Sequence, residues 1–117
     1  MLRDAGKQDK AEIYELWKQS YPNQNRNYLN FYFKNIFDKG RCIALEQDQR
    51  IISSLQLNEH ILRLRDKQLK ISYILGVSTL PDYRRRGHMR RLMESALDEA
   101  GHNHLVTLIL RPLSKAV

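Results

Sequence analysis

Apolar residues near the start of the chain repeat at helical spacing. Asp9 followed by Glu12 three positions later is typical of a capping box at the start of a helix. The apolar residues that then share one helical face are Ile13, Leu16 and Trp17. Tyr21-Pro22 ends this pattern, because proline cannot continue a helix. The sequence therefore predicts a first helix between Asp9 and Tyr21.

A second helical pattern follows the polar linker 23–26. Its apolar residues recur at spacings of three and four, at Leu29, Tyr32, Phe33, Ile36 and Phe37. Gly40 is a suitable residue just past the end of this helix.

The middle of the chain changes to strand-like segments separated by polar turns. The predicted strands are 41–47, 51–65 and 69–79, with turns at 48–50 and 65–68. Short turns between consecutive strands favour an antiparallel meander.

A third helix is predicted over 87–100, followed by an apolar strand over 105–110. The residues that share the apolar face of this helix are Met89, Leu92, Met93, Ala96, Leu97 and Ala100. Gly101 is expected to end it. Because a strand–helix–strand unit favours a parallel pair with a right-handed crossover, we expect strands 69–79 and 105–110 to pair in parallel. The predicted fold is mixed α+β, with helices on both faces of one sheet.

The composition describes one globular domain with an unusual charge. The 117 residues are 42% hydrophobic and 28% charged, with a net charge of +7. Residues 61–91 hold nine Lys and Arg against only Asp66 and Asp82. Such a surface suits a phosphorylated ligand, a nucleic acid or an acidic partner. The single cysteine, Cys42, allows no internal disulfide and favours a reducing, cytoplasmic location, and neither a signal peptide nor a membrane span is predicted.

The segment 77–91 combines a strand end, a proline turn, a basic run and a helix start. Pro81 follows the strand, and five of the eight residues in 84–91 are arginines. The N–H groups of a turn and a helix N-terminus point outward without partners, and the helix dipole adds positive potential there. Arginines oppose that dipole, so their presence favours a bound polyanion. The alternative is a solvated basic turn, which the spacing to Pro81 and the apolar helix face argue against.

This segment resembles the acetyl-CoA-binding signature of the GNAT superfamily of N-acetyltransferases, Gln/Arg-x-x-Gly-x-Gly/Ala at the start of a helix. Arg84 and Gly87 match the first two signature positions, and Met89 departs from the small third residue. The form of 83–93 looks more like the bacterial enhanced-intracellular-survival-type acetyltransferases. The resemblance is specific over about 70–110. It implies a domain that continues after the last predicted strand, so 1–117 is expected to be a single partial acetyltransferase domain.

The resemblance also implies which residues hold the coenzyme. The backbone of Val77, Ser78 and Thr79 would pair with the pantetheine arm like an added strand, and an amide there would polarise the thioester carbonyl. The residues expected to hold the pyrophosphate are Arg84, Arg85, Arg86, Gly87, His88, Met89 and Arg90. Gly76 can mark a bulge or a close approach, or be a packing glycine.

The remaining catalytic groups are not identified by the sequence. Glu46 and Glu59 lie on predicted strands and are most simply surface residues, while Tyr73 and Tyr83 suit a strand and a packed turn. The aromatic residues of the second helix suit the core, although the resemblance allows some of them to line an acceptor pocket. They are Tyr28, Phe31, Tyr32, Phe33 and Phe37. His102 and His104 lack further ligands at zinc-like spacing, so no metal is expected, and Cys42 suits a buried apolar site.

Three functions fit these observations. The first, implied by the resemblance, is direct transfer of an acetyl group from acetyl-CoA to a primary amine: an aminoglycoside-like cation, a polyamine, a small amine or a lysine side chain. The second is a nucleic-acid-binding module that holds phosphates at the arginine-rich helix start. The apolar face of the third helix and the strand-proline-arginine-glycine order argue against it. The third is a non-catalytic acetyl-CoA-binding domain. No membrane partner is expected, and an unpaired sheet edge would favour homo-oligomers.

Overall fold

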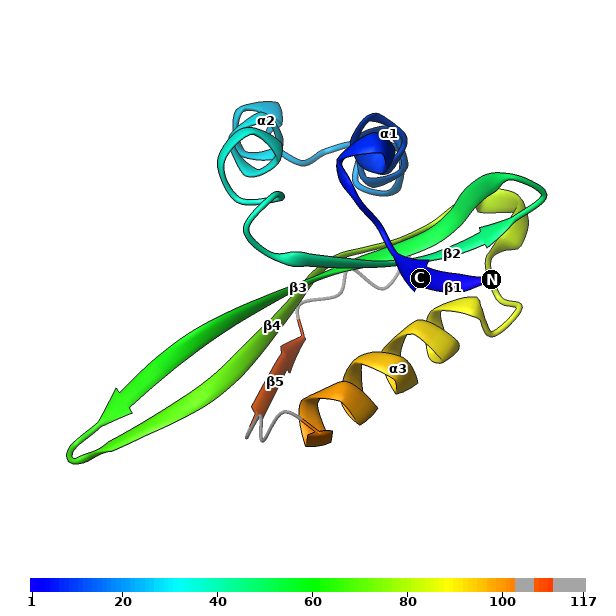
Figure 1. Ribbon diagram of the computed structural model, residues 1–117. Coiled ribbons are helices and arrows are strands. Elements are labelled where there is room, and N and C mark those ends of the chain that lie inside the picture. The colour runs from blue at the N-terminus through cyan, green and yellow to red at the C-terminus, as the bar shows by residue number, and fades with distance from the viewer. Residues whose placement is uncertain (103–106, 111–117) are drawn as a thin grey trace.

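A computed structural model describes residues 1–102 and 107–110 and shows one mixed sheet between two layers of helices (Figure 1). The sheet has the order β1-β2-β3-β4-β5. Its strands are β1 (Leu2–Asp4), β2 (Arg41–Gln47), β3 (Arg50–Leu64), β4 (Lys67–Thr79) and β5 (Thr107–Leu110). The helices are α1 (Lys10–Ser20), α2 (Arg26–Asn35) and α3 (His88–His102), with short 3₁₀ turns η1 (Lys7–Asp9) and η2 (Pro81–Tyr83). The predicted mixed α+β class is confirmed.

The strand pairing follows the predicted pattern. β2, β3 and β4 form an antiparallel meander, and β4 pairs with β5 in parallel, from Ile71↔Thr107 to Ile74↔Leu110. β1 adds an antiparallel edge strand on β2, which the sequence did not reveal because three residues are too few for a period. The predicted fifth strand began at 105, and residues 105–106 lie outside the described residues.

Two hydrophobic cores occupy the two faces of the sheet. In β2, Cys42 and Ala44 face α1 and α2, whereas Ile43 and Leu45 face α3. All four are buried, because a strand covered on both faces has no solvent side. The α1–α2 core also holds the rings of Trp17, Tyr32, Phe33 and Phe37, and the α3 core holds Leu55, Val77, Met89, Leu92 and Ala96.

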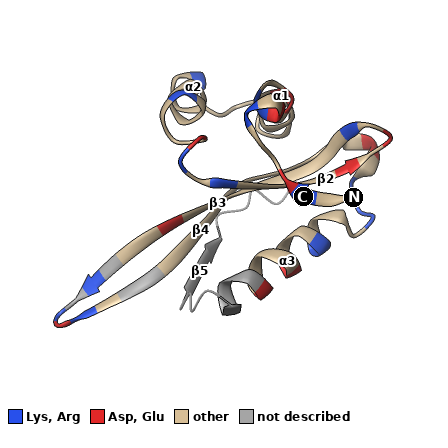
Figure 2. Ribbon diagram, viewed as in Figure 1, with Lys and Arg blue, Asp and Glu red and all other residues tan. Residues whose placement is uncertain are grey.

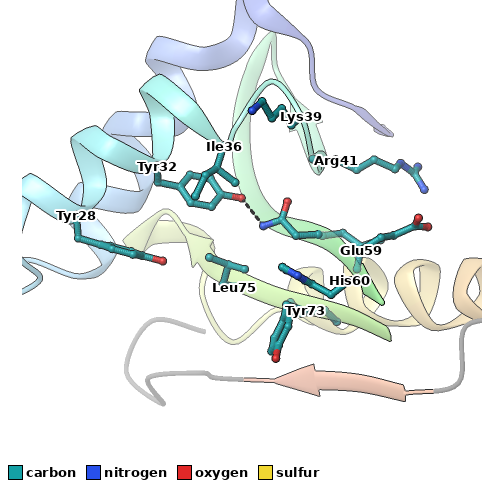
Figure 3. A pocket seen from close by; sticks show the side chains of 13 residues that line it. Tyr28, Tyr32, Ile36, Lys39, Arg41, Glu59, His60, Tyr73 and Leu75 are labelled. Carbon is teal, nitrogen blue, oxygen red and sulfur yellow. Dashed lines mark hydrogen bonds between the residues drawn. The ribbon is translucent and has the colours of Figure 1, made fainter. Parts of the chain in front are cut away.

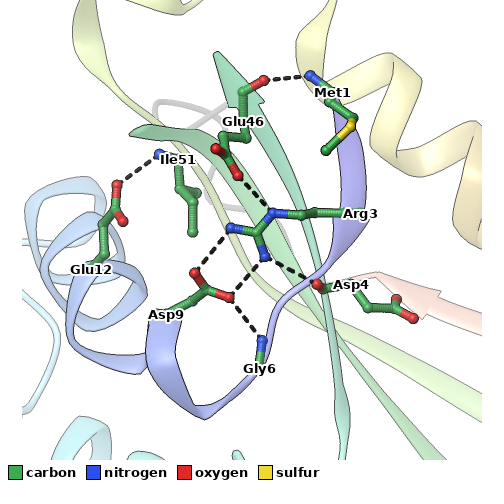
Figure 4. A network of polar contacts seen from close by, with 8 residues as sticks. All are labelled: Met1, Arg3, Asp4, Gly6, Asp9, Glu12, Glu46 and Ile51. Carbon is green, nitrogen blue, oxygen red and sulfur yellow. Dashed lines mark hydrogen bonds and ion pairs between the residues drawn. The ribbon is translucent and has the colours of Figure 1, made fainter. Parts of the chain in front are cut away.

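The bounds predicted for the first helix are confirmed, since Asp9 and Tyr21 lie at its two ends, but the predicted capping box is wrong. Asp9 does not cap α1: its carboxylate accepts hydrogen bonds from Arg3 (2.9 and 3.0 Å) and from the Gly6 N–H (2.9 Å). Glu12 reaches the sheet instead, where it accepts from the Ile51 N–H at 2.7 Å (Figure 4). The Arg3 guanidinium also holds the pKa of Asp9 below its usual range. This network, which includes an Arg3–Glu46 ion pair of 2.7 Å, ties β1 to η1 and β2.

Three apolar or glycine positions also behave differently from expectation. Gly40 lacks the left-handed backbone of a helix C-terminal glycine, and a Cβ there would displace the side-chain amide of Asn58. α3 continues through Gly101 to His102 instead of ending at the glycine. Leu97, expected on the core face, is 55% exposed. The helical spacing of apolar residues therefore predicted where α3 lies, but it did not predict which of those residues are buried.

Candidate functional site

The second half of β4 is paired on one side only. The parallel ladder with β5 stops at Ile74↔Leu110, while β4 continues to Thr79. On the β3 side, the Leu80 N–H donates to the Ile52 carbonyl at 2.8 Å, and the Ser78 carbonyl accepts from Ser53 Oγ at 3.0 Å. Because backbone groups alternate along a strand, Val77 and Thr79 direct theirs to the opposite edge. Within residues 1–102 and 107–110, no strand pairs with that edge.

Gly76 marks the irregularity in β4 just before this free edge. The register with β3 shifts between Ser54↔Ser78 and Gln56↔Leu75, so β4 carries one extra residue there. Gly76 has φ +62°, and a Cβ on it would lie 2.8 Å from the ring of Trp17. The bulge expected at Gly76 is confirmed, and the contact with the Trp17 ring shows that Gly76 is also a packing glycine. Trp17 of α1 therefore packs directly on the point where β4 changes register.

The carbonyl groups of the free edge already have partners. The Tyr21 hydroxyl donates to the Val77 carbonyl at 2.7 Å, and Arg84 Nε donates to the Thr79 carbonyl at 2.9 Å. Val77 and Thr79 are buried as whole residues, at 0% and 1% exposed. The remaining backbone groups that strand alternation directs at this edge are the N–H groups of Val77 and Thr79. Ser78, between them, directs its backbone at β3.

The turn after η2 leads directly into the start of α3. Arg85 and Gly87 have positive φ values of +65° and +82°, and the first helical hydrogen bond runs from the Arg91 N–H to the Gly87 carbonyl at 3.2 Å. The N–H groups of 88–90 therefore have no acceptor within the helix. A Cβ on Gly87 would meet nothing within 4 Å, so the space beside this turn is open. The result is a concave set of N–H donors at a helix N-terminus, a geometry that binds anions.

The arginines around this turn are available for a ligand. Arg85, Arg86 and Arg90 are exposed, and none of the ion pairs in the described part of the chain involves them. Figure 2 shows the basic loop that enters α3. The guanidinium of Arg86 lies 5.7 Å from the ring centroid of Tyr83, which confirms Tyr83 as a packed turn residue. We refer to residues 84–90 below as the basic turn.

Two residues of the predicted signature point away from solvent. Met89 is 9% exposed and packs in the α3 core, so only its backbone faces the turn. The larger residue at the third signature position is therefore accommodated by the sheet. His88 is half-buried, and its Nδ1 is buried without a hydrogen-bond partner among the described residues.

A second hollow, of about 750 Å³, lies between α2 and strands β3 and β4 (Figure 3). We call it the α2 pocket. It includes Leu75, the residue before Gly76, so it adjoins the free edge of β4. Its lining residues are Tyr28, Tyr32, Ile36, Lys39, Gly40, Arg41, Leu57, Asn58, Glu59, His60, Tyr73, Ile74 and Leu75.

The aromatic residues of α2 and the following turn divide between two roles. Tyr28 and Tyr32 line the α2 pocket. Phe33 and Phe37 are buried, with ring centroids 5.1 Å apart, and Phe31 is 55% exposed. The prediction of core packing is thus right for Phe33 and Phe37, whereas Tyr28 and Tyr32 form part of a pocket wall.

The carboxylates considered from the sequence do not point into this pocket. Glu46 pairs with Arg3 near the β1 edge of the sheet. Glu59 lies opposite Ser72, so strand alternation places its side chain on the α3 face, and Figure 3 shows its carboxylate directed away from the tyrosines. Tyr73, expected only as a strand residue, does line the pocket. The sequence signal that was missed is Asn58 and His60, two polar residues that strand spacing places on the same face of β3.

Neither Cys42 nor His102 forms a reactive or metal-binding site among the described residues. Burial raises the pKa of the Cys42 thiol to about 12, consistent with an inert apolar site. No group of three potential metal ligands occurs among the described residues, and His104 lies outside them. None of the described helices is long and apolar enough to span a membrane.

Comparison with known proteins agrees with this architecture. A predicted acetyltransferase from Clostridium acetobutylicum, solved with acetyl-CoA, superposes with a TM-score of 0.80 at 19% identity over 96% of this chain and 80% of that one. A probable N-acyltransferase from Enterococcus faecalis gives 0.85 at 15% identity over 97% of this chain, which spans only 29% of that protein. The aminoglycoside N-acetyltransferase AAC(6')-Iy, solved with a bisubstrate analogue, gives 0.75 at 15% identity over 96% of this chain and 78% of that one. No curated protein matches the chain.

The chain therefore shares its fold with solved structures of acetyltransferases and of a probable N-acyltransferase. The profile of the family described as "Acetyltransferase (GNAT) domain" matches residues 1–117. The chain therefore belongs to the GNAT acetyltransferase family.

Proposed function

We propose that this domain binds acetyl-CoA and transfers its acetyl group to a primary amine. Two neighbouring sets of backbone donors carry this proposal. The N–H groups of Val77 and Thr79 lie on the free edge of β4, and those of 88–90 lie at the start of α3 without an acceptor in the helix. A ligand with an amide-containing arm joined to a pyrophosphate matches both parts. Acetyl-CoA has this composition.

The residues of the site fit the coenzyme. In the proposed complex the exposed Arg85, Arg86 and Arg90 neutralise phosphates, and the N–H groups of Gly87 to Arg90 bind the pyrophosphate. The N–H groups of Val77 and Thr79 hold the pantetheine arm. A backbone N–H on this edge also polarises the thioester carbonyl, which favours attack by a neutral amine. Metal is not part of the proposal.

The acceptor reaches the thioester from the α1–α2 side of the sheet, where the α2 pocket adjoins Gly76. In this proposal transfer is direct, because the hydroxyls of Ser78 and Thr79 are buried and already hydrogen-bonded, to the Gly76 carbonyl and to Ser53 Oγ. The groups that take the proton from the amine and return one to the departing thiolate are not assigned. The enhanced-intracellular-survival-type likeness of 83–93 remains a prediction, as does completion of the partial domain by further chain or by self-association through the sheet edge.

Calorimetric titration with acetyl-CoA tests the binding step, with ATP and a short DNA duplex as controls. Selective micromolar binding of acetyl-CoA supports the proposal. Equal binding of ATP, or DNA binding that falls steeply with salt, supports the nucleic-acid alternative instead.

Release of free coenzyme A thiol tests the transfer step, measured with a panel of primary amines. Amine-dependent thiol release is expected. Binding without release for every amine would identify a non-catalytic acetyl-CoA-binding domain.

A further inference from the structure

The α2 pocket is built on one side of the proposed reaction site. Its β4 wall runs from Tyr73 to Leu75, and Gly76 and Val77 follow immediately. An acceptor whose amine lies beside Val77 therefore extends its remaining atoms along this wall. The chemistry of the pocket then decides which amines fit.

The walls of the pocket are aromatic and aliphatic. The rings of Tyr28, Tyr32 and Tyr73 contribute together with Ile36 and Leu75. Tyr32 is 1% exposed and forms the inner wall, whereas Tyr28 is 43% exposed and lies nearer solvent. Such walls favour a flat or apolar body, because aromatic rings gain from stacking and edge contacts.

The polar groups that face the pocket are mainly donors. Asn58 Nδ2 donates to the Tyr32 hydroxyl oxygen at 2.9 Å. The hydroxyl hydrogen of Tyr32 has no acceptor among the described residues, and burial raises the pKa of Tyr32, which keeps the hydroxyl protonated. His60 and Tyr73 lie edge to face, with ring centroids 4.7 Å apart. An acceptor oxygen on a ligand matches this arrangement.

The charged group that a ligand between the tyrosines would meet is positive. Lys39 lies on the segment between α2 and β2 and takes part in none of the ion pairs of the described residues. Its neighbour Asp38 is engaged by Lys10 at 3.2 Å, and the Glu59 carboxylate lies on the opposite face of the sheet. A polycationic amine between the tyrosines would therefore meet the Lys39 ammonium, while Glu59, the one acidic residue of the lining, directs its carboxylate away from them.

We infer that the acceptor is a monoamine with an aromatic or apolar body and one anionic group, and not a polyamine or an aminoglycoside. This inference rests on the proposed function. Within it, the amine reaches the free edge of β4, the body lies between the tyrosines, and the anionic end meets Lys39, the Tyr32 hydroxyl and the His60 side of the pocket. Acetyl transfer forms the amide N–C bond, breaks the thioester C–S bond, and passes the amine proton on to yield free thiol.

Three probes that differ at one end test the inference. They are 4-(aminomethyl)benzoate, benzylamine and p-xylylenediamine, which carry a carboxylate, a hydrogen and a second ammonium opposite the reacting amine. The expected order of kcat/KM is carboxylate, then hydrogen, then ammonium, with about tenfold between the first and last. Equal rates for all three, or a preference for the diamine, would overturn the inference while leaving the acetyltransferase proposal intact.

Two lysine variants locate the effect. Lys39→Glu is expected to reverse the order of the three probes, and Lys34→Glu, the same charge change on an exposed residue of α2 outside the pocket, is expected to leave it unchanged. If Lys34→Glu shifts the order as much as Lys39→Glu, the selectivity does not arise in this pocket. Calorimetric binding of the probes to the protein alone gives the same ranking without turnover. Failure of acetyl-CoA itself to bind is a separate result, which refutes the proposed function.

Discussion

The basic turn and the α2 pocket are two halves of one proposed site, and they are built in different ways. The basic turn offers backbone N–H groups within a short stretch, 84–90, and its geometry depends on left-handed residues and a helix start. The α2 pocket is formed by side chains from α2, the loop before β2, β3 and β4. The first half is encoded locally and the second only by tertiary structure. A local motif can therefore identify a coenzyme while leaving the acceptor unspecified.

Gly87→Val gives the largest expected effect on the basic turn. A β-branched residue is strained at φ +82°, and its Cβ enters the open space where a phosphate would lie. Affinity for acetyl-CoA should fall by at least about 1000-fold, or ~4 kcal/mol, in calorimetric titrations. Circular dichroism should still show the folded protein, because the Cβ collides with nothing. Unchanged affinity would mean that the coenzyme does not lie on this turn.

Gly76→Ala makes the matching change at the other left-handed glycine. Here a Cβ would lie 2.8 Å from the Trp17 ring, at φ +62°. We expect the free energy of unfolding to fall by about 2–3 kcal/mol in urea titrations, from strain and overpacking. A loss below about 0.5 kcal/mol would show that the bulge can relax, and that the contrast between the two glycines is not one of packing.

Replacement of Arg85 and Arg86 together by alanine sharpens the role of the basic turn. Both side chains are exposed, so the fold should be unaffected. Binding of coenzyme A and of acetyl-CoA should weaken equally, by about tenfold, because the two ligands share their phosphates. Selective loss of acetyl-CoA binding would place these arginines near the thioester instead.

Tyr21→Phe has the smallest expected effect and tests the junction between the two halves. The variant removes the 2.7 Å hydrogen bond to the Val77 carbonyl and leaves that buried acceptor unpaired. The free energy of unfolding should fall by about 1 kcal/mol. The free edge should also be held less firmly, so kcat should fall more than the affinity for acetyl-CoA. No change in either quantity would mean that Tyr21 does not position this edge.

The sequence predicted the parts of the fold that depend on repeated local patterns. The strands β2, β3 and β4 and the helix α3 follow from apolar period and turn residues, with ends displaced by a few residues. Long-range contacts were not predictable in the same way. The spacing of Asp9 and Glu12 suits a capping box, but the Asp9 carboxylate accepts from Arg3 and the Glu12 carboxylate accepts from the Ile51 N–H instead. β1 has only three residues, which are too few to show the alternation of apolar and polar residues that identifies a strand.

The candidate site shows the same division. Arg84 and Gly87 could be proposed from the family resemblance because the turn and the helix start lie within one segment. The α2 pocket could not, since Lys39, His60 and Tyr73 meet only after the β3–β4 register is set. Strand register depends on the bulge at Gly76, which shifts β4 by one residue and selects Val77 and Thr79 for the free edge. A single glycine in a sequence does not specify this shift.

The most direct test is an amide NMR titration of the 117-residue chain with acetyl-CoA. The largest shifts are expected at the N–H groups of Val77, Thr79 and 87–90, with little change at the paired residues Ile71 to Ile74. Shifts confined to other parts of the molecule, or none at all in a folded sample, would contradict the claim that the free edge of β4 and the basic turn form one coenzyme site.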